Sequence, residues 1–265
     1  STETFLLNAM LGGILASLVC GMIGPFVVVK RIGYIAGGIS HAVLGGMGAA
    51  VYFNQDPFLG AMLSAVLIAI VMGIVSLRRS ESQDITISAL WAAGMAVGVI
   101  LLAKTPGYKV DLMAYLFGNI LMIPQESLWL TFGVALVILA VIAGFYRNFV
   151  AIAFDPQFAL LRGVSVTFYE LLMLSMVALA SVILMQLVGL ILVLAIMTLP
   201  AAIARMFTHS IVKMMVGSFL LGTMFTIVGL FVAYDANLPA GATIILVAAS
   251  VFVGTAFYVR IRGHA

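Results

Sequence analysis

Residues 168–206 read FYELLMLSMVALASVILMQLVGLILVLAIMTLPAAIARM, and this stretch decides the fold class. It contains one acidic and one basic side chain. A helix crosses the hydrocarbon core of a bilayer in about 20 residues, so the stretch is long enough for two crossings. Only Gln186 and Gly189 mark a break, and Pro200 tends to kink a helix because it lacks a backbone donor. Two interpretations follow: two complete spans, or one span and a broken, partly re-entrant helix.

The whole chain shares this apolar character. Of its 265 residues, 65% are apolar and 8% are charged, and the mean hydropathy is +1.29. Soluble domains have about 45–50% apolar and about 25% charged residues. The composition therefore excludes a nucleic-acid-binding domain, a secreted disulfide scaffold and an ordinary soluble enzyme. The single cysteine, Cys20, excludes an intrachain disulfide and a cysteine-based metal site.

Polar residues, prolines and glycines divide the chain into nine apolar runs, and the alternation of a membrane β-strand is absent. No basic segment precedes the first run as it would in a signal peptide, so we expect this run to remain as a span. The sequence predicts an all-α, polytopic transmembrane bundle of eight to nine spans, in a single domain over residues 1–265. The runs are 6–29, 35–53, 57–77, 86–103, 126–146, 168–186, 188–206, 212–234 and 239–259.

The basic residues orient these spans. With nine spans, only Lys104 and Lys109 fall on one side, and the other ten Lys and Arg residues fall on the opposite side. Lys and Arg are enriched in cytoplasmic loops, so we expect the N-terminus outside and the C-terminus in the cytoplasm. The expected location is the plasma (inner) membrane. Merging the sixth and seventh runs would spoil this charge pattern.

One loop contains the signals of a short helix. Asp155-Pro156 is typical of a helix start, with Asp as the N-cap and Pro at the first helical position. Gly163 is typical of a helix end. We therefore predict a short helix, roughly two turns long, on the cytoplasmic side. It either rests on the lipid headgroups or docks a cytoplasmic partner.

His41 is the one ionisable side chain well inside a predicted span. If this span begins near Gly33, His41 lies about 12 Å along the helix, close to the midplane. Gly37, Gly45 and Gly48 share its helix face, so open space or a very close helix backbone lies opposite. Two interpretations remain. His41 is hydrogen-bonded across a small-residue packing interface, or it is a ligand or gate residue for zinc, manganese or iron.

Several energy-coupling and catalytic motifs are absent. The pattern G-x-x-x-x-G-K-[ST] does not occur, so the chain cannot hydrolyse ATP by a P-loop mechanism. No Asp or Glu lies in the middle of a span, where a proton or sodium relay would need one. H-E-x-x-H and G-x-S-x-G are also missing, which disfavours an intramembrane enzyme. The outer acids are either solvated or raise the cation concentration at a cavity mouth. They include Asp56, Asp111, Glu126 and Asp235.

Five motifs, in order along almost the whole chain, resemble the membrane permease of the zinc/manganese class of ABC importers. Each is weak alone, and their order makes the resemblance specific. They are VKR at 29–31 with ISHAVLGG at 39–46, DLMAYLFG at 111–118, the loop 154–163, QLVG at 186–189 leading to LPAA at 199–202, and PAGATI at 239–244.

This resemblance implies a homodimeric permease of the type II importer kind. Two copies would sit on a dimer of cytoplasmic ABC ATPase subunits, which bind the ATP. An extracytoplasmic metal-binding protein would deliver the cargo, a divalent metal ion. Zinc is the first expectation, and manganese or iron are the alternatives. No permanently bound cofactor and no nucleic-acid partner are implied, and the bilayer is the remaining partner.

The resemblance also guides the choice of site residues. Loop 154–163 resembles the coupling helix of that family, and Gln157 stands where the family usually has Glu. Gly37 stands where the family has an acidic residue one turn before the histidine. His41 therefore acts with Ser40, with another helix, or without direct coordination. The candidate metal residues are His41, Ser40 and Asp235; the coupling residues are Phe154, Asp155, Pro156, Gln157, Arg162 and Gly163; the structural residues are Gly37, Gly45, Gly189 and Pro200.

The sequence thus predicts the permease half of an ATP-driven importer, a transport subunit without an ATPase site of its own. The alternative from another class is a self-sufficient channel or facilitator for a metal or a small solute. A third hypothesis is a membrane scaffold or sensor subunit, in which the glycine-rich second span only packs against its neighbours.

Overall fold

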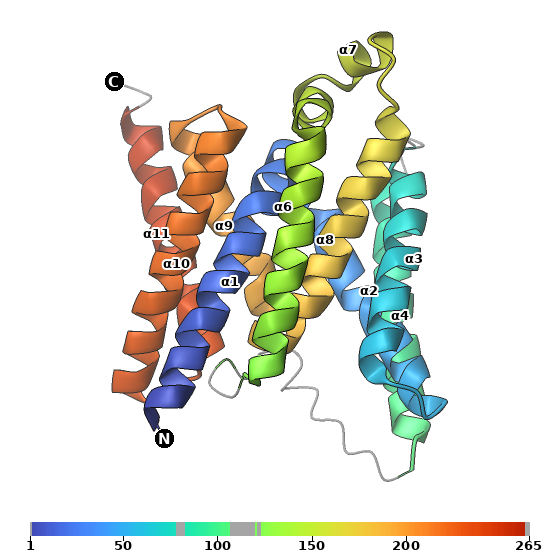
Figure 1. The fold of residues 1–265 in the computed structure, drawn as a ribbon, viewed down its shortest axis with the longest axis vertical. Coiled ribbons are helices and arrows are strands. Elements are labelled where there is room, and N and C mark those ends of the chain that lie inside the picture. The colour runs from blue at the N-terminus through green and yellow to red at the C-terminus, as the bar shows by residue number, and fades with distance from the viewer. Residues whose placement is uncertain (1, 78–82, 107–119, 121–122, 263–265) are drawn as a thin grey trace. The chain divides into compact units, whose positions relative to one another are not determined.

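The computed structural model describes residues 2–77, 83–106, 120 and 123–262, and within that part the regular structure is helical (Figure 1). Nine helices there, all except α7, are long and apolar enough to cross a membrane. The predicted all-α transmembrane bundle is therefore confirmed, with nine candidate spans. The helices are α1 (Thr2–Val29), α2 (Gly33–Tyr52), α3 (Pro57–Leu77), α4 (Gln83–Lys104), α6 (Gln125–Phe154), α7 (Pro156–Leu161), α8 (Val166–Val188), α9 (Leu190–Phe207), α10 (Ile211–Ala236) and α11 (Ala240–Arg262).

The apolar stretch around Gly189 forms two separate helices. Gly189 has φ 83° and ψ 157°, a backbone conformation that side chains with a Cβ rarely adopt, and it caps the start of α9. The helix then runs from Leu190 to Phe207 with Pro200 in its interior. Both helices are candidate spans by length and composition, and a complete crossing by α9 stays a prediction.

The fifth predicted span, 126–146, ends at a kink in α6. We expected a span over 126–146 followed by a loop, but α6 continues to Phe154, with one non-helical residue at Phe145 (φ −116°, ψ 20°). The segment after Arg147 is again apolar, and Phe149 and Ile152 are fully buried, which favours continued helix over a solvated loop.

The chain forms two compact units. Unit 1 comprises Ser1–Arg31, Met113–Tyr146 and Ile183–Ala265, and unit 2 comprises Ile32–Leu112 and Arg147–Val182. The expectation of a single domain over 1–265 stays a prediction.

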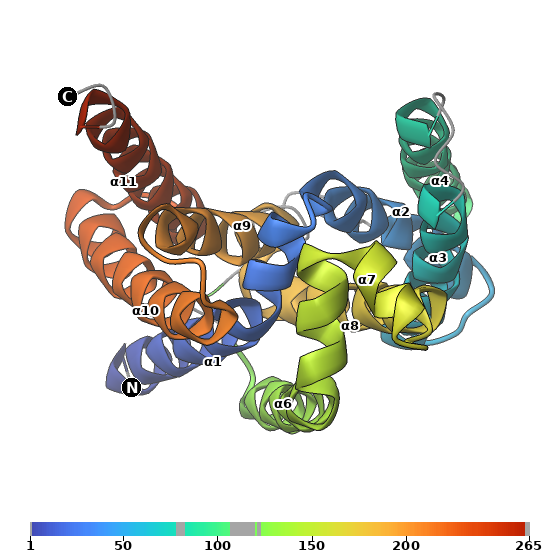
Figure 2. The same ribbon diagram turned by 90° about the horizontal axis from the view of Figure 1, so that it is seen from above.

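In unit 1, α1 packs against α9 and α10, and α11 packs against the same two helices (Figure 2). A Cβ on Gly24 would collide with the carbonyl oxygen of Met197, and one on Gly21 would lie 3.0 Å from the backbone nitrogen of Phe219. Glycine is thus required where these helix backbones approach closely. Arg205 of α9 also contacts Val28, so α9 runs parallel to α1, whereas Gly13 contacts Thr226 of α10, so α10 runs antiparallel.

In unit 2, α2 packs against both α3 and α4. A Cβ on Gly45 would lie 2.7 Å from the carbonyl oxygen of Gly94, and one on Gly48 would lie 2.6 Å from that of Gly98. These pairs advance together along both helices, so α2 and α4 run parallel. Their register fixes which side chains of α4 face His41.

Candidate functional site

His41 lies eight residues after Gly33, the first residue of α2, which is about 12 Å along the helix axis. This depth is the one that the sequence predicted. The imidazole is half-buried and packs on the indole of Trp91 in α4, with ring centroids 4.6 Å apart and an interplanar angle of 41°. The indole therefore lies against one side of the imidazole in a tilted arrangement.

A hydrogen bond orients the His41 ring. Its Nδ1 lies 2.8 Å from the carbonyl oxygen of Gly37. A carbonyl can only accept, so Nδ1–H is the donor in this hydrogen bond. Metal-binding histidines characteristically donate their second ring N–H in this way, often to a backbone carbonyl. This hydrogen bond leaves Nε2 as the ring nitrogen for a metal ion in our hypothesis, and metal binding by His41 stays a prediction.

The glycine face of α2 lies against backbone. The contacts of Gly45 and Gly48 with α4 decide between the two alternatives that the sequence left open, in favour of a closely approaching helix. The structural role of Gly45 stays a prediction. The same register brings Trp91 against His41.

Trp91 and Tyr34 are contacts of this site that the sequence analysis missed. The Tyr34 and Trp91 rings lie 5.9 Å apart, and the Tyr34 hydroxyl donates to the Asp84 carbonyl at 3.1 Å. The Trp91 indole N–H donates to the sulfur of Met95 at 3.3 Å. One signal was present: Trp91 is one of two tryptophans in the chain, and it lies within a span, whereas tryptophans favour the membrane interface.

The other two candidate metal residues are placed differently. Ser40 is buried, and its hydroxyl donates to the Ala36 carbonyl of its own helix at 2.9 Å. Asp235 belongs to unit 1, where it is exposed in the last turn of α10. Among the described residues, no group of three or more His, Cys, Asp or Glu side chains gathers as a metal site. Metal binding by Ser40 and Asp235 stays a prediction.

The predicted short helix is confirmed as α7. The Asp155 carboxylate accepts from the Phe158 backbone N–H at 2.9 Å, Pro156 opens the helix, and Gly163 follows with φ 78°. This is the N-cap and C-terminal glycine pattern expected from the sequence.

The surface of α7 combines apolar and polar groups. The side chains of Phe154, Phe158 and Leu161 are all more than half exposed, and Gln157 is exposed beside them. The Arg162 guanidinium lies over the Phe158 ring, 5.3 Å from its centroid. Such a surface suits both interpretations given above, headgroup contact and partner docking.

The two long helices that flank α7 are tied to each other. The Asn148 side chain of α6 donates to the Tyr169 hydroxyl of α8 at 2.7 Å, and the Phe149 and Tyr169 rings meet edge to face at 5.6 Å. A displacement of α7 would therefore act on both helices.

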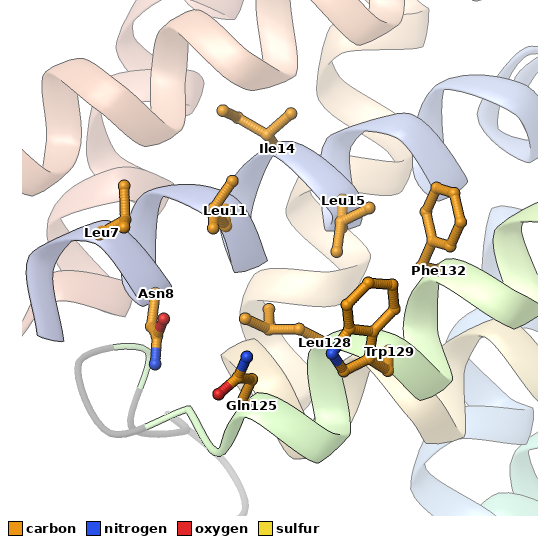
Figure 3. Close-up of a pocket in the computed structure, with 9 residues that line it drawn as sticks. All are labelled: Leu7, Asn8, Leu11, Ile14, Leu15, Gln125, Leu128, Trp129 and Phe132. Atoms are coloured by element: carbon orange, nitrogen blue, oxygen red, sulfur yellow. The ribbon is translucent and has the colours of Figure 1, made fainter. Parts of the chain in front are cut away.

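A groove of about 610 Å³ lies between α1 and α6 of unit 1 (Figure 3). Asn8 and Gln125 form its polar end, and the Asn8 amide donates to the Ile123 carbonyl at 3.3 Å. None of the lining residues of the groove is titratable. Its lining residues are Leu7, Asn8, Leu11, Ile14, Leu15, Gln125, Leu128, Trp129 and Phe132.

The predicted family motif at 111–118 and the charge pattern that orients the spans both include residues that the structure does not describe. The DLMAYLFG motif at 111–118 lies outside the described residues, as does Lys109. The orientation of the termini stays a prediction.

Comparison with known proteins gives consistent matches. The model of the ABC 3 transport family matches residues 2–259. The chain is 41% identical over 249 residues to an uncharacterized membrane protein of Synechocystis, covering 94% of this chain and 89% of the relative. It is 32% identical over 255 residues to the manganese transport system membrane protein MntC of Halalkalibacterium halodurans, covering 96% and 87%. The structure of PsaBC from Streptococcus pneumoniae in complex with Fab matches with a TM-score of 0.84 and 33% identity, covering 95% and 90%.

Proposed function

The chain belongs to the ABC 3 transport family, and from that premise we propose that it is the permease subunit of an ATP-binding-cassette importer for a divalent transition metal ion. The observation that carries the proposal is similarity along almost the whole chain to relatives named for manganese or metal transport. Those names favour manganese as the first cargo to test. Zinc, the first expectation from the sequence, and iron remain the alternatives.

The partners follow from the proposed role. The chain has no P-loop, so a pair of ABC ATPase subunits supplies the ATP hydrolysis. A second copy of the chain completes the membrane part, and an extracytoplasmic binding protein delivers the metal. In this arrangement the N-terminus is outside, α7 faces the cytoplasm, and the chain itself holds no permanent cofactor.

The residues support a division of labour. His41 lies about 12 Å along α2 from its first residue. A cation without a ligand is costly inside a membrane, and Nε2 of His41 would be such a ligand. The capped helix α7 is compact and exposed, which suits a contact that transmits force. The bond between Asn148 and Tyr169 carries movement of α7 into α6 and α8. ATP-driven closure of the partner would thereby change access to His41.

The test is reconstitution. Vesicles should contain either the chain alone or the chain with its ATPase partner and binding protein, and uptake of radioactive manganese, zinc and iron is followed with and without ATP. We expect ATP-dependent accumulation against the gradient by the complex and no uptake by the chain alone. Metal entry through the chain alone, without ATP, would instead establish the channel hypothesis. Failure of all three metals would reject a metal cargo.

A further inference from the structure

Four helix ends meet at one end of unit 1. The parallel packing of α1 and α9 places their C-termini together, and the Arg205 guanidinium of α9 donates to the Val28 carbonyl of α1 at 2.9 Å. The antiparallel helix α10 contributes its N-terminus to this end. A Cβ on Gly229 of α10 would meet the α-carbon of Ile244 at 2.7 Å, and this close contact makes α11 antiparallel to α10. The C-terminus of α11 therefore belongs to the same end (Figure 1).

This end of unit 1 is strongly basic. Its five side chains Arg31, Arg205, Lys213, Arg260 and Arg262, which we call the basic rim, all lie in or beside the last turn or first turn of these four helices. All except the half-buried Arg205 are exposed. Lys30 and His209 add two further basic groups at this end.

No described acidic side chain of unit 1 balances this charge. Asp235 lies at the C-terminus of α10, which is the opposite end of the unit. Glu126 lies in the first turn of α6, and the bond from Asn8 to Ile123 associates that turn with the N-terminal part of α1, again at the opposite end. Within the described part of unit 1, the acidic side chains Asp235 and Glu126 thus lie away from the basic rim.

Exposed apolar side chains alternate with the rim cations. Phe207 is 65% exposed two residues after Arg205, and Phe257 is 67% exposed on the helix that carries Arg260. The Arg262 guanidinium lies over the Tyr258 ring, 4.9 Å from its centroid. A polar protein surface would leave these apolar groups in water, whereas the boundary between headgroups and acyl chains accommodates both kinds.

We propose that the basic rim binds the phosphate groups of anionic phospholipids. Clusters of Lys and Arg at the ends of membrane spans bind anionic headgroups, and each cation contributes about fivefold in affinity near the surface. The alternation of cations with exposed apolar groups favours lipid over an acidic protein. This inference does not depend on the transported metal.

The experiment compares two matched double variants of the full chain co-expressed with its ATPase partner. Lys213→Gln with Arg260→Gln removes two exposed rim cations, and Lys104→Gln with Arg147→Gln removes two exposed cations of unit 2. Each protein is equilibrated in mixed micelles of phosphatidylglycerol and phosphatidylcholine, and bound lipids are counted by native mass spectrometry at low and high salt. Elution profile and thermal unfolding verify the fold of each variant.

We expect the wild type to prefer phosphatidylglycerol, and high salt to reduce that preference. In the rim variant the preference for phosphatidylglycerol should fall about tenfold, which is less than the factor of about 25 that two such charges supply. In the unit 2 variant it should fall less than about twofold. Equal preference in wild type and rim variant would overturn the proposal. Release of the ATPase partner from the rim variant with unchanged lipid preference would overturn it in favour of a protein-docking surface.

Discussion

Glycine allows close helix packing in both units. In unit 1 it does so at the contacts of α1, and in unit 2 at the contact between α2 and α4, but the consequences differ. Gly24 and Gly48 both lie where a neighbouring carbonyl leaves no room for a Cβ. In unit 1 the nearby hydroxyls bond back to their own helices, as Ser17 does to Gly13 and Thr226 to Gly222. In unit 2 the close approach brings Trp91 against His41, whose Nδ1 bonds to the Gly37 carbonyl. Close helix packing is thus structural by itself and becomes a candidate site only where it orients a group such as the His41 imidazole.

The largest effect should come from removing that group. We expect His41→Ala to lower ATP-dependent metal uptake at least 100-fold while the complex still assembles, because no other described titratable side chain lies in the middle of α2. His209→Ala, in the loop before α10, is the matched control and should transport normally. Uptake at the wild-type rate by His41→Ala would return His41 to a packing role.

Replacing a closely packed glycine by alanine should lower the stability of the protein by a similar amount in both units. Gly48→Ala and Gly24→Ala each force a Cβ against a backbone carbonyl, and such overpacking costs about 1–3 kcal/mol of unfolding free energy. Gly133→Ala in α6 is the control, since no neighbouring atom lies within 4 Å of the added Cβ. Thermal unfolding of the purified chains measures the three effects. A Gly48→Ala protein as stable as Gly133→Ala would contradict the close α2–α4 approach.

Replacing the Trp91 side chain should weaken the apparent affinity for the metal while the complex still assembles. We expect Trp91→Leu to raise the metal concentration for half-maximal uptake about tenfold, because the His41 ring loses its tilted aromatic contact. Trp91→Phe keeps an aromatic face and should stay within about threefold. Similar affinities for the two variants would mean that the stacking does not position His41.

The smallest effect concerns the cap of α7. Asp155→Ala removes the acceptor for the Phe158 N–H and costs about 1 kcal/mol of local helix stability. We expect ATP hydrolysis to continue with less metal moved per ATP, which is measured by assaying both in the same vesicles. Asp56→Ala provides the control, because Asp56 caps α3 through the Phe58 N–H at 2.7 Å. An unchanged ratio in Asp155→Ala would argue against α7 as the coupling element.

The fold was largely predictable because the lipid environment imposes simple rules. A span must be apolar for about 20 residues, and the stretch 168–206 is long enough for two spans. The cap of α7 was equally accessible, since Asp155, Pro156 and Gly163 act locally. The family prediction from the five ordered motifs is also confirmed.

The contacts between helices were less accessible. The stacking of Trp91 on His41 depends on the register between α2 and α4, which separate apolar runs do not specify. The glycine face around His41 predicted either a closely approaching helix backbone or open space, and the sequence did not decide between the two. The end of α6 was missed because Arg147 marked the expected end of the span, and buried packing of Phe149 kept the helix going.

Electron spin echo spectroscopy of Mn²⁺ bound to the reconstituted complex tests the central claim most directly, because it detects nitrogen atoms bonded to the ion. The account predicts a coupling from imidazole nitrogen in the wild type and in His209→Ala, and its loss in His41→Ala. A spectrum without imidazole coupling in the wild type, or one that persists unchanged in His41→Ala, would contradict it.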